Sequence, residues 1–427
     1  MNTLALDAVE IEDESASVRT DVNIRPIPRI SIQAFCENQN LADMFEKCAA
    51  DRRMAKAHTK IHMGGIGAAA DFYASAPTPN LIVIETQGSA NQILTDLDRL
   101  SEVCDAGTKV IVVGQVNDVL LYRELMRRGI SEYLVAPIDL FAMMEVVGDL
   151  FVSPEAETLG KAIAFVGAKG GCGASTIAHN VSWAISSGFE SDVILADLDL
   201  PFGTAGLDFN QDPLQGIHEA VGAPERLDDT LLDRLLTRCA DHLSLLSAPA
   251  SLEKSYDFGE ETFDGLMDVM RNGVPSVILD VPHQWTAWVR RIMSSTDEIV
   301  IVAEPELANL RNAKNLMDNI KQLRPNDPTP QLVLNRVGVP KRPEIKPDEF
   351  ASALEVDPIA VIPFEPQLFG TASNNGQMIS EVDGKNQVGG MIDTIAQVVT
   401  GRMEVRKPKK SPLGPILARL RGKSKEA

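Results

Sequence analysis

The stretch FVGAKGGCGASTIAHNVSWAI, residues 165–185, decides the fold. An apolar strand runs into a loop with closely spaced glycines, and a helix with apolar periodicity is expected from about Ser175. The backbone N–H groups of such a loop, together with the positive end of the helix dipole, bind phosphates. Gly170, Gly171 and Gly173 allow the close backbone approach that side chains would block. The sequence therefore predicts a phosphate-binding loop between a strand and a helix.

One cation that such loops usually carry is missing here. Gly173, Ala174 and Ser175 occupy the last three positions of the pattern GxxxxGK[ST], so Ala174 stands where the usual Lys would be. Apart from Ala174, residues 169–175 follow KGGxGK[ST] with Lys169 as its first Lys, so the loop resembles the deviant Walker A loop of the MinD/ParA-like ATPases. In that family the signature Lys reaches across a nucleotide-sandwich dimer, which implies a catalytic role in trans for Lys169. The Ala at position 174 predicts weak ATP binding, slow hydrolysis or both, so the chain is at most a weakly active ATPase.

Two acids follow apolar strands in the order that this family shows. VILADLDLPFGTAGLDF, residues 193–209, resembles the first switch, which implies that Asp199 positions the attacking water. SVILDVP, residues 276–282, ends its strand in Asp280, like a Walker B acid that holds Mg²⁺ through water. Solvated acids at strand ends are the alternative interpretation of both.

Weaker matches concern the base. LVLNRV, residues 332–337, resembles the strand with the adenine-recognising Asn, here Asn335, and IPFEP, residues 362–366, resembles the segment beside the base. ATP and Mg²⁺ are the expected cofactors, with Ser175 and Asp280 as the expected metal ligands. The residues expected to bind the nucleotide are Gly170, Gly171, Cys172, Gly173, Ala174, Ser175, Thr176, Asn335 and Pro363.

Apolar runs alternate with helical patterns along most of the chain. This alternation predicts an α/β protein with parallel sheets whose two faces are covered by helices. We expect a small domain over 29–152, a linker over 153–160 and a doubly wound P-loop domain over 161–400. The expected strands are 30–35, 81–86, 109–114, 132–136, 161–168, 192–197, 243–248, 276–281, 298–303, 331–335 and 360–364.

The two ends of the chain differ in charge. Residues 1–28 are expected to form a flexible acidic leader. Residues 402–427, within the predicted basic tail 401–427, hold nine Lys and Arg against two Glu. Apolar residues from Leu413 to Leu420 follow helical spacing, which is compatible with a membrane-surface contact. A solvated tail, or one that contacts an acidic partner, is the alternative.

The small domain resembles a response-regulator receiver in its order of strands and helices. A working receiver needs paired acids, an acceptor Asp, a hydroxyl and a Lys. Here these positions hold Glu37, Glu85, Gly114 and Ala136, so aspartyl phosphorylation is not expected. The degenerate domain is predicted to serve docking or dimerisation. An unrelated small flavodoxin-like domain is the alternative.

A degenerate receiver followed by a MinD-like domain resembles the CpaE/TadZ family of Flp (Tad) pilus assembly proteins, over roughly residues 29–400. The resemblance implies a cytoplasmic protein that localises pilus machinery, often at a cell pole, through ATP-dependent homodimerisation. Tad/Flp pilus secretion components and a polar landmark protein are the implied partners.

Composition limits the alternatives. The net charge of −20 disfavours nucleic-acid binding and therefore a ParA-type partition ATPase. A signalling protein with a working receiver is disfavoured by the residues named above. Five scattered cysteines indicate reduced thiols, and no run is long or apolar enough to span a membrane.

Overall fold

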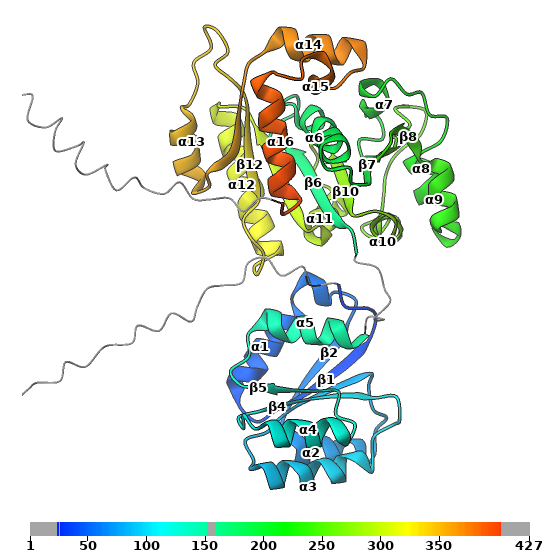
Figure 1. Cartoon of the computed structure of the whole chain (residues 1–427), viewed down its shortest axis with the longest axis vertical. Helices are drawn as coiled ribbons and strands as arrows, with labels where there is room; N and C mark the ends of the chain where they lie inside the picture. The colour runs from blue at the N-terminus through cyan, green and yellow to red at the C-terminus, as the bar shows by residue number, and fades with distance from the viewer. Residues whose placement is uncertain (1–23, 25, 152–158, 403–427) are drawn as a thin grey trace, which may run out of the picture. The chain divides into compact units, whose positions relative to one another are not determined.

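The computed structural model describes residues 24, 26–151 and 159–402. The predicted leader, linker and basic tail lie outside these ranges except at their edges. The chain divides into two compact units, the first containing residues 1–156 with 324–328 and the second containing 157–323 with 329–427. Each unit has its own sheet (Figure 1). Each unit also has its own hydrophobic cores.

The first unit is a parallel five-stranded sheet in the order β2-β1-β3-β4-β5, the flavodoxin-like order. Its strands are β1 (Ser31–Cys36), β2 (His58–Met63), β3 (Leu81–Glu85), β4 (Lys109–Gly114) and β5 (Glu132–Val135). Its helices are α1 (Gln39–Ala49), η1 (Arg52–Met54), α2 (Gly65–Tyr73), α3 (Ala90–Ser101), α4 (Val119–Arg127) and α5 (Leu140–Phe151).

Helices cover both faces of this sheet. α1 and α5 contribute Phe45 and Met144 to the core on one face, and α2, α3 and α4 contribute Ile66, Leu97 and Leu125 to the core on the other. The strands β3 and β4 are almost fully buried, as their unbroken apolar runs predict.

The second unit is an eight-stranded sheet in the order β13-β12-β11-β6-β10-β7-β9-β8. All neighbouring strands are parallel except β8 and β9. The strands are β6 (Lys161–Gly167), β7 (Val193–Asp197), β8 (Thr237–Ala240), β9 (Leu243–Leu246), β10 (Ser276–Val281), β11 (Glu298–Ala303), β12 (Gln331–Val337) and β13 (Pro358–Pro363).

The helices of this unit also form two layers. One layer packs with α6 (Ala174–Phe189) and contains α7 (Ala205–Asp208), α14 (Pro366–Asn375), α15 (Ile379–Val382) and α16 (Gln387–Val399). The other contains α8 (Ile217–Gly222), α9 (Asp229–Leu235), α10 (Asp264–Gly273), α11 (Ala287–Ser295), α12 (Leu307–Leu323) and α13 (Pro347–Leu354). The short helix η2 (Pro224–Arg226) lies between α8 and α9 in the chain and has no buried residue. This arrangement confirms the predicted α/β fold class for both units.

The strand β6 lies in the middle of the sheet, between β10 and β11. In the register, Asp280 of β10 pairs with Phe165 of β6 on one side and with Asp197 of β7 on the other. The carboxyl ends of these three strands therefore bring the phosphate loop and two acids to one edge of the sheet.

Two strands were not among those expected from the sequence. The edge strand β2 has the polar sequence HTKIHM and is half exposed, so it shows no apolar run. The edge strand β8 has four residues and pairs only with β9. Among the described helices, none has both the length and the apolar character that crossing a membrane requires.

Candidate functional site

The phosphate loop joins the end of β6 to the start of α6. Gly171 and Gly173 have φ of 84° and 91°, in the left-handed region that favours glycine. A Cβ at Gly173 would lie 2.5 Å from the amide nitrogen of Asn335, so a side chain here would have to displace Asn335. Gly173 directly precedes α6, and no described side chain caps the helix there. The first N–H groups of α6 are therefore available to an anion.

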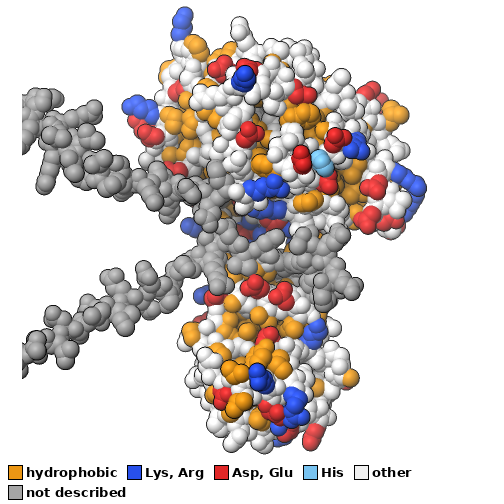
Figure 2. Space-filling model, viewed as in Figure 1, with side chains coloured by type: hydrophobic (Ala, Val, Ile, Leu, Met, Phe, Trp, Pro, Cys, Tyr) orange, Lys and Arg blue, Asp and Glu red, His pale blue; other side chains and the backbone are white. Residues whose placement is uncertain are grey.

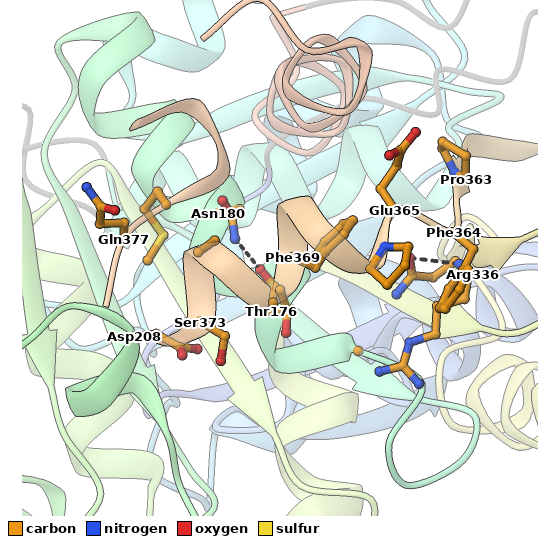
Figure 3. Close-up of a pocket in the computed structure, with 16 residues that line it drawn as sticks. Thr176, Asn180, Asp208, Arg336, Pro363, Phe364, Glu365, Phe369, Ser373 and Gln377 are labelled. Atoms are coloured by element: carbon orange, nitrogen blue, oxygen red, sulfur yellow. Dashed lines mark hydrogen bonds between the residues drawn. The ribbon is translucent and has the colours of Figure 1, made fainter. Parts of the chain in front are cut away.

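A cavity of 340 Å³ opens beside this end of α6. Figure 3 shows Arg336, Pro363 and Phe364 at one end of the cavity, Asp208, Ser373 and Gln377 at the other, and Thr176 between them. Gly173 and Asn335 also line the cavity. Its volume lies in the range of small-molecule pockets, and its position next to the loop fits a ligand that joins a phosphate to a larger group.

Lys169 lies on the exposed outer side of the loop. Its Nζ is 2.7 Å from Oε1 of Glu306, the residue before α12, and half of the Lys169 side chain is accessible to solvent. The hydrogen bond with Glu306 raises the pKa of Lys169, and the same bond lowers the pKa of Glu306. Ala174, in contrast, is half-buried and packs against the core beneath α6.

Two buried acids lie side by side behind the loop. Asp197 is fully buried and Asp280 is 3% exposed. The Asp197 carboxylate accepts hydrogen bonds from the N–H groups of Asp199 and Ala205, both at 3.1 Å. Burial, with a further contribution from the charge of Asp280, raises the pKa of Asp197 to about 7. Two adjacent buried carboxylates favour the approach of a cation.

Asp199 begins the turn that follows β7. Its Oδ1 accepts a hydrogen bond from the Phe202 N–H at 3.3 Å, and its backbone carbonyl accepts one from Gly203 at 2.6 Å. Burial raises the pKa of this half-buried carboxyl. Asp199 therefore organises the segment between β7 and α7, on the same sheet edge as the loop.

His179 belongs to this site although the sequence reading did not single it out. It lies on α6, one turn after Ser175, and is fully buried. Its Nδ1 is 2.7 Å from Oδ2 of Asp208, and its Nε2 is 3.3 Å from Oδ2 of Asp280. Burial lowers the pKa of His179, but the two carboxylates outweigh burial and raise it to about 10. The spacing of Ser175 and His179, four residues apart on one helix, was the available signal.

Asn335 and Pro363 lie where β12 and β13 reach the cavity. The Asn335 Nδ2 donates to the carbonyl of Cys172 in the loop at 2.9 Å, and its Oδ1 accepts from the N–H of Arg336. The Asn335 amide thus ties β12 to the phosphate loop. A nucleotide base could bind only to the donor and acceptor sites of the Asn335 amide that these two hydrogen bonds do not use.

The other predicted residues surround the loop. Cys172 is buried, and its Sγ donates to the carbonyl of Val302 at 3.2 Å, so it packs the loop against β11. Gly170 is exposed, Ser175 is half-buried in the first turn of α6, and Thr176 lines the cavity. All of the predicted site residues therefore lie in the second unit, around one end of its central strands.

The acceptor position of the receiver-like unit is closed by its own side chain. The buried Glu85 carboxylate accepts hydrogen bonds from the N–H groups of Glu37 and Asn38, at 2.7 and 2.9 Å, and from the Asn38 side chain. A Cβ at Gly114 would lie 2.3 Å from the Tyr133 hydroxyl, so Tyr133 fills the space of the missing hydroxyl residue. Glu85 and Tyr133 are therefore engaged in contacts within the first unit.

The chain is similar to proteins of two kinds, although no protein-family model matches it. The pilus assembly protein CpaE from Caulobacter crescentus CB15 is 51% identical, over 30% of this chain and 98% of that chain, with a TM-score of 0.30. A ParA family ATPase from Chlorobium tepidum TLS is 26% identical, over 56% of this chain and 98% of that chain, with a TM-score of 0.51. The septum site-determining protein MinD from Pyrococcus horikoshii OT3, solved in complex with Mg-ADP, is 20% identical, over 56% and 96%, with a TM-score of 0.50.

Proposed function

Because this chain belongs to the MinD/ParA family of ATPases and its N-terminal region matches the CpaE pilus assembly proteins, we propose that it binds Mg²⁺·ATP and localises pilus assembly machinery. Nucleotide binding gates its homodimerisation in this proposal. The dimer acts in the cytoplasm, at a cell pole, on Tad/Flp secretion components and a polar landmark protein.

The main support for the proposed nucleotide binding is the N-terminus of α6, which no described side chain caps and which lies beside the cavity. The loop N–H groups and the helix dipole would hold the phosphates, and the nucleoside would extend into the cavity toward Pro363. The complex of Mg-ADP with the MinD of P. horikoshii supports the same ligand class.

Mg²⁺ fits the donor set at this edge of the sheet. Ser175 offers a hydroxyl and Asp280 a buried carboxylate, and hard oxygen donors of this kind suit Mg²⁺. The ion would neutralise charge on the phosphates. Asp199, on the turn after β7, is the residue proposed to orient the attacking water. Since Ala174 supplies no cation, hydrolysis is proposed to be slow or absent.

Homodimerisation is proposed to require movement of Lys169. Its present partner is Glu306 in the same chain, so the side chain must leave this ion pair to contact phosphates bound to a second copy. The pair is exposed, and such pairs contribute little to stability, which makes the exchange feasible.

Calorimetric titration of the full chain with ATP and Mg²⁺ tests the proposal. We expect saturable binding in the wild type and loss of binding in Gly173→Ala, because the added Cβ pushes Asn335 away from the loop. Gly188→Ala, at the far end of α6 where a Cβ meets nothing within 4 Å, is the matched control and should bind normally. Absence of binding to the wild type at millimolar ATP would falsify the nucleotide proposal.

The choice of pilus machinery over DNA rests on charge and on the CpaE match. The net charge is −20, and acidic and basic side chains are interspersed on the face that Figure 2 shows. Fluorescent tagging in the native cell should place the protein with the pilus secretion components. A distribution that follows the nucleoid instead would favour the partition ATPase.

A further inference from the structure

His179 is a fully buried polar side chain to which the proposed function assigns no role. Its ring is enclosed between two carboxylates, and the Phe209 ring lies 5.9 Å away. Its Nε2 makes no hydrogen bond of acceptable geometry with any described residue, although Asp280 is only 3.3 Å from it. Burying a polar ring in this way costs free energy, so packing alone does not account for a His here.

The two carboxylates come from different parts of the site. Asp280 lies one residue before the end of β10 and is the acid proposed to hold Mg²⁺, whereas Asp208 is the last residue of α7 and faces the cavity. The hydrogen bond from His179 to Asp208 is short, at 2.7 Å. One imidazole thus joins the metal end of the site to the wall of the nucleotide cavity.

The short helix α7 is held at both of its ends by this group of residues. At its start, the Ala205 N–H donates to Asp197, which pairs with Asp280 in the sheet. At its end, Asp208 contacts His179, which reaches Asp280. Both ends of α7 are therefore connected to Asp280.

We propose that His179 is a positioning residue that couples Asp280 to α7, so that Mg²⁺ at Asp280 fixes the cavity wall at Asp208. The inference rests on the proposed binding of Mg²⁺·ATP. Side chains that orient a metal-binding carboxylate from behind typically affect metal affinity by about ten- to a hundredfold.

Two conservative variants separate the two ends of the imidazole. Gln at 179 can keep a donor near the position of Nε2, facing Asp280, whereas Asn can keep one near Nδ1, facing Asp208. We expect Mg²⁺ to raise ATP affinity in the wild type and in His179→Gln. In His179→Asn this Mg²⁺ enhancement should fall about tenfold, while ATP binding in EDTA stays unchanged. If His179 only fills space, His179→Gln and His179→Asn should show the same Mg²⁺ enhancement of ATP affinity.

The second readout is hydrogen exchange of residues 199–209 with and without Mg²⁺·ATP. The wild type should show protection of this segment on binding, and both His179→Gln and His179→Asn should lose it, because neither side chain joins the two acids. Asp208→Asn should also lose the protection while it keeps the Mg²⁺ enhancement of ATP affinity. Asp208→Asn therefore still tests the coupling between Asp280 and α7 if the His179 variants do not fold.

His242→Leu is the matched control. His242 pairs with Asp192 through Nδ1 at 2.8 Å, at the opposite ends of β7 and β9 from the site, and its loss should change neither readout. Normal Mg²⁺ enhancement in His179→Asn, or retained protection in Asp208→Asn, would overturn the coupling while leaving nucleotide binding intact. A wild type that binds no ATP would overturn the proposed function, and the coupling with it.

Discussion

Ala174 removes a positive charge from a loop that is otherwise built to hold phosphates. Ala174→Lys should raise ATP affinity about tenfold or more, since a hydrogen bond to a charged group is worth about 1.5–3 kcal/mol. Ser187→Lys adds the same charge at the exposed far end of α6 and should leave the affinity unchanged. Calorimetry on both variants checks this. Equal affinities in Ala174→Lys and the wild type would mean that another group already supplies the charge.

Lys169 is expected to act on a second copy of the chain. Lys169→Ala should stay folded and lose ATP-dependent self-association, measured by light scattering. Glu306→Gln removes the competing carboxylate and should shift self-association to lower ATP concentrations. Normal association of Lys169→Ala would rule out the role in trans.

The acid cluster makes stability depend on pH. The folded pKa of His179 is raised from 6.5 to about 10, so its contribution is complete below pH 6.5 and is lost as pH rises through 10. The folded pKa of Asp197 is raised from 3.8 to about 7, and its contribution is likewise lost as pH rises through 7. Without nucleotide, the melting temperature should fall between pH 7 and pH 10.

The matched measurement is the same pH series on His179→Leu. Its melting temperature should fall less between pH 7 and pH 10 than that of the wild type. Parallel curves for the two proteins would show that His179 does not carry the pH dependence.

At the scale of elements, α11 and the residues just before it show what a sequence pattern can and cannot predict. HQWTAWVRRIM, residues 283–293, holds two Trp beside two Arg, a composition that fits either a partner surface or helix packing. In the structure, the two Trp side chains differ in their exposure to solvent. Trp288 is 5% exposed and contacts Phe263 at 4.9 Å between ring centroids, whereas Trp285 is 41% exposed.

The two Trp therefore differ in what their removal does. Trp288→Ala should lower the free energy of unfolding by about 3–5 kcal/mol, the usual range for a buried aromatic. Trp285→Ala should change it by no more than about 0.5 kcal/mol. Urea denaturation of both variants measures the difference. A small loss in Trp288→Ala would mean that the core around α11 repacks.

The strands that the sequence predicts most accurately are those buried on both faces. SVILDV and EIVIVA are mostly apolar segments, and β10 and β11 begin and end where those segments do. β2 and β8 escaped prediction because β2 has a polar sequence and β8 has only four residues, whereas the edge strands β5 and β13 carry short apolar runs. The loop and its acids were visible in local patterns. The contacts of His179 and Glu306 were not, because they join residues distant in sequence that only the folded sheet brings together.

At the scale of the whole molecule, the two units have separate cores. A fragment of residues 24–151 should therefore fold alone. Circular dichroism and a cooperative thermal transition of the fragment test it. A fragment without a cooperative transition would show that the first unit depends on residues beyond 151.

The central position of β6 also determines the order in which parts of the protein can fold during synthesis on the ribosome. The first unit has all five strands once Val135 has emerged. The phosphate loop follows β6 directly, yet its neighbours β10 and β11 end at Val281 and Ala303. Such distant pairing is slow to form. A nascent chain therefore contains all five strands of the first unit long before it can hold a nucleotide, and chains interrupted before Ala303 are expected to be released without that ability.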